Sequence, residues 1–168
     1  KLNYGVDYMN GRWGHFDPIP NTWQKMLDIL LFWAAKDIDG FRCDMAEMVP
    51  VEFWGWAIPQ VKEQYPAIIF IAEVYNPHEY RNYIFNGHFD YLYDKVGLYD
   101  TLRALTCGHE TATNIPFRWQ SLSGIEKHML NFLENHDEQR IASEFFAGNP
   151  FKAIPAMVVS ACMNTNPV

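Results

Sequence analysis

Three acidic residues stand where apolar, strand-like segments of the sequence end. They are Asp44, Glu73 and Asp137. Asp44 and Glu73 are 29 positions apart, the length of one strand-helix unit, and Glu73 and Asp137 are 64 apart, about two such units. In a parallel barrel the carboxyl ends of all strands meet at one rim, where active sites form. The spacing therefore predicts that these carboxyl groups converge on one cleft.

Converging carboxyl groups suit acid and nucleophile chemistry at a glycosidic bond. Desolvation and mutual repulsion raise the pKa of one member of such a set, so that one group is ionised and another protonated. Hydrolysis with retention through a covalent intermediate needs this division of roles. Arg42 lies two residues before Asp44, on the same strand face, and can hold the Asp44 carboxylate ionised. A single carboxylate at a strand end is commonly a helix cap or a surface charge, so the prediction depends on all three together.

Alternating strands and helices have to position these residues. The predicted strands are Ile38–Asp44, Ala67–Val74, Phe89–Tyr93 and His128–Asn135. The predicted helices are one capped by Asn21 with an apolar stripe through Ala34, Pro50–Gln64 with an interruption near Pro59, Pro77–Phe85, Leu98–Leu105, Glu138–Ala147 and Pro150–Met163; residues 106–124 are expected to be looser. This order predicts an α/β fold with a parallel sheet, either doubly wound or a (β/α)₈ barrel. No Gly-rich phosphate loop follows a strand, which argues against a nucleotide-binding fold.

Composition excludes several classes of partner. The 168 residues carry a formal net charge of −7, whereas nucleic-acid binding needs clustered Lys and Arg. No apolar run reaches the roughly 18 residues of a membrane span, so none is expected. Cys43, Cys107 and Cys162 show no metal or redox spacing and are expected to be buried free thiols. Nothing in the sequence assigns a compartment.

Three short blocks carry a resemblance to a known family. Gly40–Asp44, Glu73–Tyr75 and Asn135–Asp137 resemble the strand-four, strand-five and strand-seven blocks of the alpha-amylase family of retaining glycoside hydrolases. The resemblance implies that Asp44 is the nucleophile that attacks the anomeric carbon. It also implies that Glu73 protonates the leaving oxygen and then activates water, and that Asp137 holds the hydroxyls of a distorted sugar ring.

The resemblance also suggests residues that contact an oligo- or polysaccharide substrate. These are Arg42, His136, Tyr75 and Glu47. Many family members have Lys-His where Glu47-Met48 stands here, which leaves the substrate preference open. The chemistry requires no cofactor, and no metal ligand is assigned. A structural calcium ion, found in many members, has no support in these residues.

The resemblance implies a partial barrel. Leu2–Tyr4 resembles the stretch between strands three and four, and Thr165–Val168 resembles the beginning of strand eight. Residues 1–168 are therefore expected to be a fragment of one catalytic (β/α)₈ TIM-barrel domain, strands four to seven with their helices, where a whole barrel takes ~250 residues. A half barrel exposes two sheet edges. Alone, it is expected to self-associate or to have little activity.

Several functions remain open at this point. The leading hypothesis is retaining hydrolysis of alpha-glucans such as starch and maltooligosaccharides, with a transglycosylase or branching member of the family as an alternative. A second hypothesis is a non-enzymatic, family-like interaction domain. A third is a metal-dependent hydrolase using Glu134, His136 and Asp137, because Glu134 and His136 share a strand face.

Overall fold

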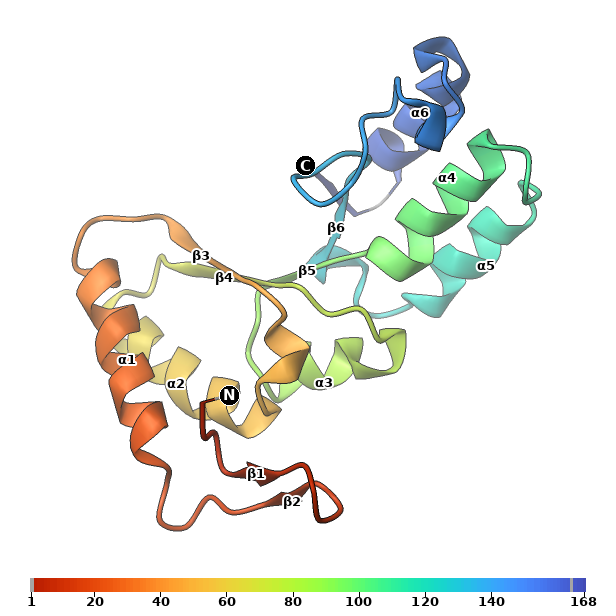
Figure 1. Ribbon diagram of the computed structural model, residues 1–168. Helices are drawn as coiled ribbons and strands as arrows, with labels where there is room; N and C mark the ends of the chain where they lie inside the picture. Colours follow the sequence, from red (N-terminus) through yellow and green to blue (C-terminus); the bar gives the residue numbers. More distant parts are fainter. Residues whose placement is uncertain (1, 164) are drawn as a thin grey trace. The chain divides into compact units, whose positions relative to one another are not determined.

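The computed structural model describes residues 2–163 and 165–168. The chain divides into two compact units. The first runs to Val74 and includes His78–Asp90, and the second consists of Tyr75–Pro77 and Tyr91–Val168. Figure 1 shows the elements of each unit.

The first unit holds two parallel strands and the helices around them. Its elements are α1 (Asn21–Ala34), β3 (Gly40–Cys43), η1 (Ala46–Met48), α2 (Val51–Gln64), β4 (Ile69–Ala72), η2 (Pro77–Glu79, which starts in the second unit) and α3 (Tyr80–Phe85). In Figure 1, α1, α2 and α3 lie on the same side of the two strands. Strand β3 pairs with β4 in parallel, and Cys43 lies opposite Ala72. The carboxyl ends of the two strands are therefore level.

A short antiparallel hairpin precedes these elements and was not predicted. It consists of β1 (Val6–Asp7) and β2 (Trp13–Gly14). Each strand has only two residues, too few for an alternating pattern to show in the sequence.

The apolar stripe of α1 faces the core, as predicted. Trp23, Leu27, Leu30 and Ala34 are buried. The ring of Trp23 meets that of Phe53 on α2 at a centroid distance of 5.6 Å. The predicted Asn21 cap is wrong: Pro20 occupies the N-cap, and its carbonyl accepts from Trp23 N at 2.9 Å.

Helix α2 is continuous through Pro59, so the predicted interruption is wrong. A proline inside a helix removes one hydrogen bond and crowds the preceding turn. Here Ile58 and Val61, on either side of Pro59, are fully buried. Tertiary packing of this face outweighs the local preference.

The second unit holds three parallel strands with short helices. Its elements are β5 (Tyr91–Tyr93), the π-helical turn η3 (Lys95–Tyr99), α4 (Asp100–Thr106), α5 (Asn114–Ser121), η4 (Glu126–His128), β6 (Met129–Asn131), η5 (Glu144–Phe146), η6 (Pro150–Ala153), α6 (Ile154–Cys162) and β7 (Asn166–Pro167). Strand β6 pairs in parallel with both β5 and β7. The parallel α/β prediction is thus confirmed within each unit.

Two segments of the second unit differ from prediction. The stretch 106–124 contains the helix α5, and Glu138–Ala147 is not helical apart from the single turn η5. In the latter segment, side chains bind the backbone: Ile141 N donates to Glu134 Oε1 at 2.8 Å and Glu138 N donates to Asn135 Oδ1 at 2.8 Å. Such side-chain acceptors compete with the hydrogen bonds of a helix.

The three cysteines are free, as predicted, but only Cys43 is buried. Burial raises the pKa of the Cys43 thiol to about 12, against a smaller opposing effect of Arg42. Cys162 is exposed because it lies on a different face of α6 from the buried residues Ala156 and Ser160. Within the described residues, no helix has both the length and the apolar character needed to cross a membrane.

Candidate active site

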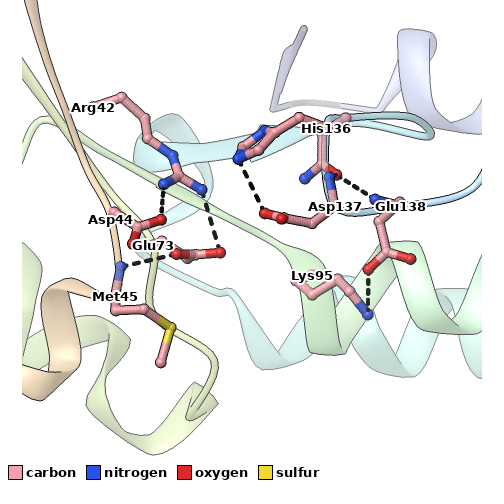
Figure 2. Close-up of polar contacts among 9 residues, drawn as sticks. Arg42, Asp44, Met45, Glu73, Lys95, His136, Asp137 and Glu138 are labelled. Carbon is pink, nitrogen blue, oxygen red and sulfur yellow. Dashed lines mark hydrogen bonds and ion pairs between the residues drawn. The ribbon is translucent and has the colours of Figure 1, made fainter.

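The end of β3 carries an ion pair between Arg42 and Asp44. Arg42 Nη1 donates to Asp44 Oδ1 (Figure 2). Because the two residues are two positions apart, their side chains point to the same side of the extended chain, as the sequence predicted. The Asp44 side chain is 72% exposed. Its carboxylate is therefore held by a cation yet remains open to a ligand.

Glu73 lies beside this pair, directly after β4. The backbone N–H of Glu73 donates to Cys43 O at 3.1 Å, which continues the parallel ladder one residue beyond the two strands. Arg42 Nη2 lies 3.3 Å from Glu73 Oε1. The parallel register thus places Asp44 and Glu73 on the same guanidinium, as Figure 2 shows.

The two carboxyl groups have opposite environments. The Glu73 side chain is only 5% exposed, whereas that of Asp44 is largely in solvent. Oε2 of Glu73 accepts from the backbone N–H of Met45 at 2.8 Å. One guanidinium therefore faces both carboxyl groups, one of them largely in solvent and the other buried. Retaining glycoside hydrolysis uses two carboxyl groups whose environments differ, one as nucleophile and one as proton donor.

Met45 gives this cluster its shape. Its backbone is left-handed, with φ of 46° and ψ of 42°, a conformation that residues other than Gly, Asn and Asp rarely adopt. The turn directs the Met45 N–H at Glu73 and starts η1, where Glu47 lies half-buried. Strained backbone often accompanies functional sites.

We expect Met45 variants to separate backbone strain from side-chain packing. Met45→Val should lower the free energy of unfolding by about 1–2 kcal/mol, because a β-branched residue tolerates a positive φ poorly. Met45→Gly should stay within about 0.5 kcal/mol, since glycine relieves the strain but adds entropy to the unfolded chain. Urea denaturation measures both. Met48→Val, at an exposed neighbouring methionine with an ordinary backbone, is the matched control. Equal losses for Met45→Val and Met45→Gly would contradict the role of strain.

The loop after β6 carries two more of the predicted residues, His136 and Asp137. His136 Nε2 lies 3.1 Å from Asp137 Oδ2, and both side chains are exposed. Asn135 Oδ1 accepts from the backbone N–H of Asp137 at 2.9 Å and of Glu138 at 2.8 Å. The Asn side chain thus holds the turn that presents Asp137.

The predicted residues are divided between the two units. Arg42, Asp44 and Glu73 form one cluster in the first unit. His136 and Asp137 form a pair in the second unit. The second unit also contains Tyr75, which is half-buried. The convergence of Asp137 with the cluster of the first unit stays a prediction.

Glu134, suggested as a metal ligand, is engaged inside its own loop. Its Oε2 pairs with Arg140 Nη1 at 2.8 Å, and its Oε1 accepts from Ile141 N. Across residues 2–163 and 165–168, no group of three or more His, Cys, Asp or Glu side chains is placed to hold a metal ion.

Sequence reasoning missed two features of the site. One is the Met45 turn, because a methionine in the sequence gives no sign that its backbone is left-handed. The other is a network in which the half-buried Lys95 and the buried Tyr99 bind Glu138, next to Asp137. Lys95 and Glu138 are far apart in the chain, and nothing in their local sequences indicates that they pair.

Comparisons with known proteins place this geometry in a family context. No protein-family model matches the chain. A curated relative, the alpha-1,4-glucan:maltose-1-phosphate maltosyltransferase of Cereibacter sphaeroides, is 39% identical over 57 residues, which cover 34% of this chain and 10% of that protein.

Solved structures match over nearly all of the chain. An alpha-amylase from Lactobacillus plantarum has a TM-score of 0.72 and 24% identity over 96% of this chain and 42% of its own. An Anoxybacillus alpha-amylase has a TM-score of 0.78 and 18% identity over 99% of this chain and 41% of its own. The chain thus spans less than half the length of each protein that it matches here. At these identities the structures show the fold alone, an α/β fold with a parallel sheet that matches part of each amylase. The resemblance to the alpha-amylase family is confirmed.

Proposed function

We propose that this chain supplies the nucleophile and the acid/base of a retaining glycoside hydrolase that acts on alpha-glucans such as starch and maltooligosaccharides. The observation that carries the proposal is the shared guanidinium of Arg42, which joins an exposed Asp44 to a buried Glu73 at the level ends of two parallel strands. The similarity to a glucan maltosyltransferase and to alpha-amylases supports an alpha-glucan as substrate.

In the proposed mechanism, Asp44 attacks the anomeric carbon as the glycosidic bond breaks. Glu73 gives its proton to the leaving oxygen in that step, which forms a glycosyl ester on Asp44 and releases the shortened glucan. Glu73 then takes a proton from water, and the water oxygen displaces Asp44. Arg42 neutralises Asp44 before attack and after release.

Asp137 and His136 are proposed to bind hydroxyls of the sugar substrate, and Tyr75 and Glu47 to contact the substrate. Hydrogen bonds that strengthen in the transition state lower the barrier more than uniform binding does. The Asn135 turn supports this role, because it leaves the Asp137 carboxylate exposed while holding its backbone.

We also propose that residues 1–168 are part of one (β/α)₈ barrel domain and contribute strands four to seven. The match to less than half of each amylase chain supports this assignment. Activity experiments therefore use the chain within its complete barrel.

The stereochemistry of the first product tests the proposed function. With maltooligosaccharides, the α-anomer should appear first by ¹H NMR, before mutarotation, because two successive displacements retain configuration. The Asp44→Asn protein serves as the blank. A β-anomer appearing first would overturn the covalent mechanism.

A glycosyl transferase is the second candidate, favoured by the similarity to the maltosyltransferase of Cereibacter sphaeroides. Transfer uses the same two carboxyl groups but replaces water with a sugar hydroxyl. Maltose 1-phosphate offered with a glucan acceptor would then yield longer glucans and inorganic phosphate. Maltooligosaccharides incubated alone would yield only shorter products if hydrolysis is the reaction.

A further inference from the structure

One tyrosine holds the loop of Asp137 at both of its ends. The ring of Tyr99 stacks on Phe132, with centroids 5.0 Å apart and planes at 6°. Its hydroxyl donates to Glu138 Oε2 at 2.8 Å. Phe132 precedes the loop and Glu138 follows Asp137 directly, so the segment between them is anchored to a single side chain. Tyr99 itself is only 1% exposed.

Lys95 supplies the charge that this anchor needs. Its Nζ lies 3.0 Å from Glu138 Oε1 and 2.8 Å from Asp100 Oδ1. The Glu138 side chain is only 13% exposed, and a carboxylate removed from water requires a partner. Burial acts to lower the pKa of Lys95, but the hydrogen bonds to Asp100 and Glu138 outweigh it and the pKa is raised. The ammonium is therefore retained.

A π-helical turn brings the side chains of Lys95 and Tyr99 to the same partner, Glu138. Both belong to η3, which Asp94 caps by accepting from Gly97 N at 3.1 Å. A Cβ at Gly97 would lie 2.3 Å from Asp94 Oδ1, so a side chain there would displace the Asp94 carboxylate that caps the turn. π-helical turns are rare and occur frequently at functional positions.

The anchor is transmitted to Asp137 through the backbone. Asn135 Oδ1 accepts from both Asp137 N and Glu138 N, which locks the two residues into one turn. Figure 2 shows Lys95 below Glu138, joined to it by a dashed line. A displacement of Glu138 therefore moves the peptide that carries Asp137.

We propose that Tyr99 and Lys95 are positioning residues for Asp137 and act through Glu138. This inference rests on the proposed function, in which Asp137 binds sugar hydroxyls in the transition state. A catalytic group displaced by about 1 Å can lose up to about 100-fold in rate, so a remote anchor has a measurable effect.

Tyr99→Phe tests the anchor with the smallest change. It removes the hydrogen bond to Glu138 and keeps the stacking on Phe132. We expect kcat on maltooligosaccharides to fall about tenfold while KM changes less than about twofold. Tyr83→Phe is the matched control, because the buried Tyr83 also donates at 2.8 Å, to Val49 O, outside this network. It should lose comparable thermal stability and retain kcat.

A double-mutant cycle distinguishes positioning from general stability. Asp137→Asn alone should lower kcat about 100-fold or more, and adding Tyr99→Phe should change it by less than about twofold. Glu138→Gln, which keeps the size of the side chain but not its charge, should show the same non-additivity. Losses that multiply in the double variant, or a kcat for Tyr99→Phe equal to that of Tyr83→Phe, would overturn the positioning role alone. An Asp137→Asn protein with normal kcat would instead overturn the role proposed for Asp137.

Discussion

Asp44→Asn should lower kcat on maltooligosaccharides by about 10⁴-fold and leave the fold intact. The amide cannot form the glycosyl ester, and no other carboxylate in the described cluster is both exposed and paired with Arg42. Because the Asp44 side chain is 72% exposed, losing its ion pair should change the free energy of unfolding by no more than about 1 kcal/mol. Single-turnover kinetics with purified protein, together with thermal melting, measure both effects.

The control for this variant is Asp39→Asn. Asp39 is exposed and lies immediately before β3, at the opposite end of the strand from Asp44. The same loss of one negative charge there should leave kcat unchanged. Near-normal rates for Asp44→Asn on starch, pullulan and short maltooligosaccharides would contradict the assignment of Asp44 as the nucleophile.

Glu73→Gln should give a loss that depends on the leaving group. With a maltooligosaccharide, which needs a proton on the departing oxygen, kcat/KM should fall about 10³-fold. With an α-glycosyl fluoride, whose leaving group needs less protonation, formation of the glycosyl ester should continue. Water attack then lacks its base, so the ester on Asp44 should accumulate and be detected by mass spectrometry of the intact protein.

Added azide should restore turnover of the fluoride by Glu73→Gln, because this anion attacks without a general base and yields an α-glycosyl azide. Glu52→Gln, an exposed glutamate in the first turn of α2, is the matched control and should behave as the wild type with both substrates. Equal losses for maltooligosaccharide and fluoride would remove Glu73 from the acid role. The Glu73 side chain is buried, so thermal melting has to accompany the kinetics.

The sequence alone determined the features that depend on local pattern. The period of apolar residues in α1 follows from the helical repeat and survives any tertiary context that buries one face. The runs that end near Asp44 and Glu73 predicted parallel strands, and the observed β3–β4 register confirms their pairing. The proximity of Asp44 and Glu73 followed from the same pattern, because level parallel strands end at one edge, whereas the contact of Arg42 with Glu73 was not predicted.

Tertiary structure alone decided how each side chain is used. Nothing local distinguishes Asp44 from Glu73, yet one is exposed and the other buried, since burial depends on what the rest of the fold packs around it. Pro59 stays helical and Glu138–Ala147 does not, because distant packing and side-chain acceptors outweigh propensity. The contact of Tyr99 with Glu138 joins residues 39 positions apart. Such contacts follow from the path of the whole chain, which no short window of sequence encodes.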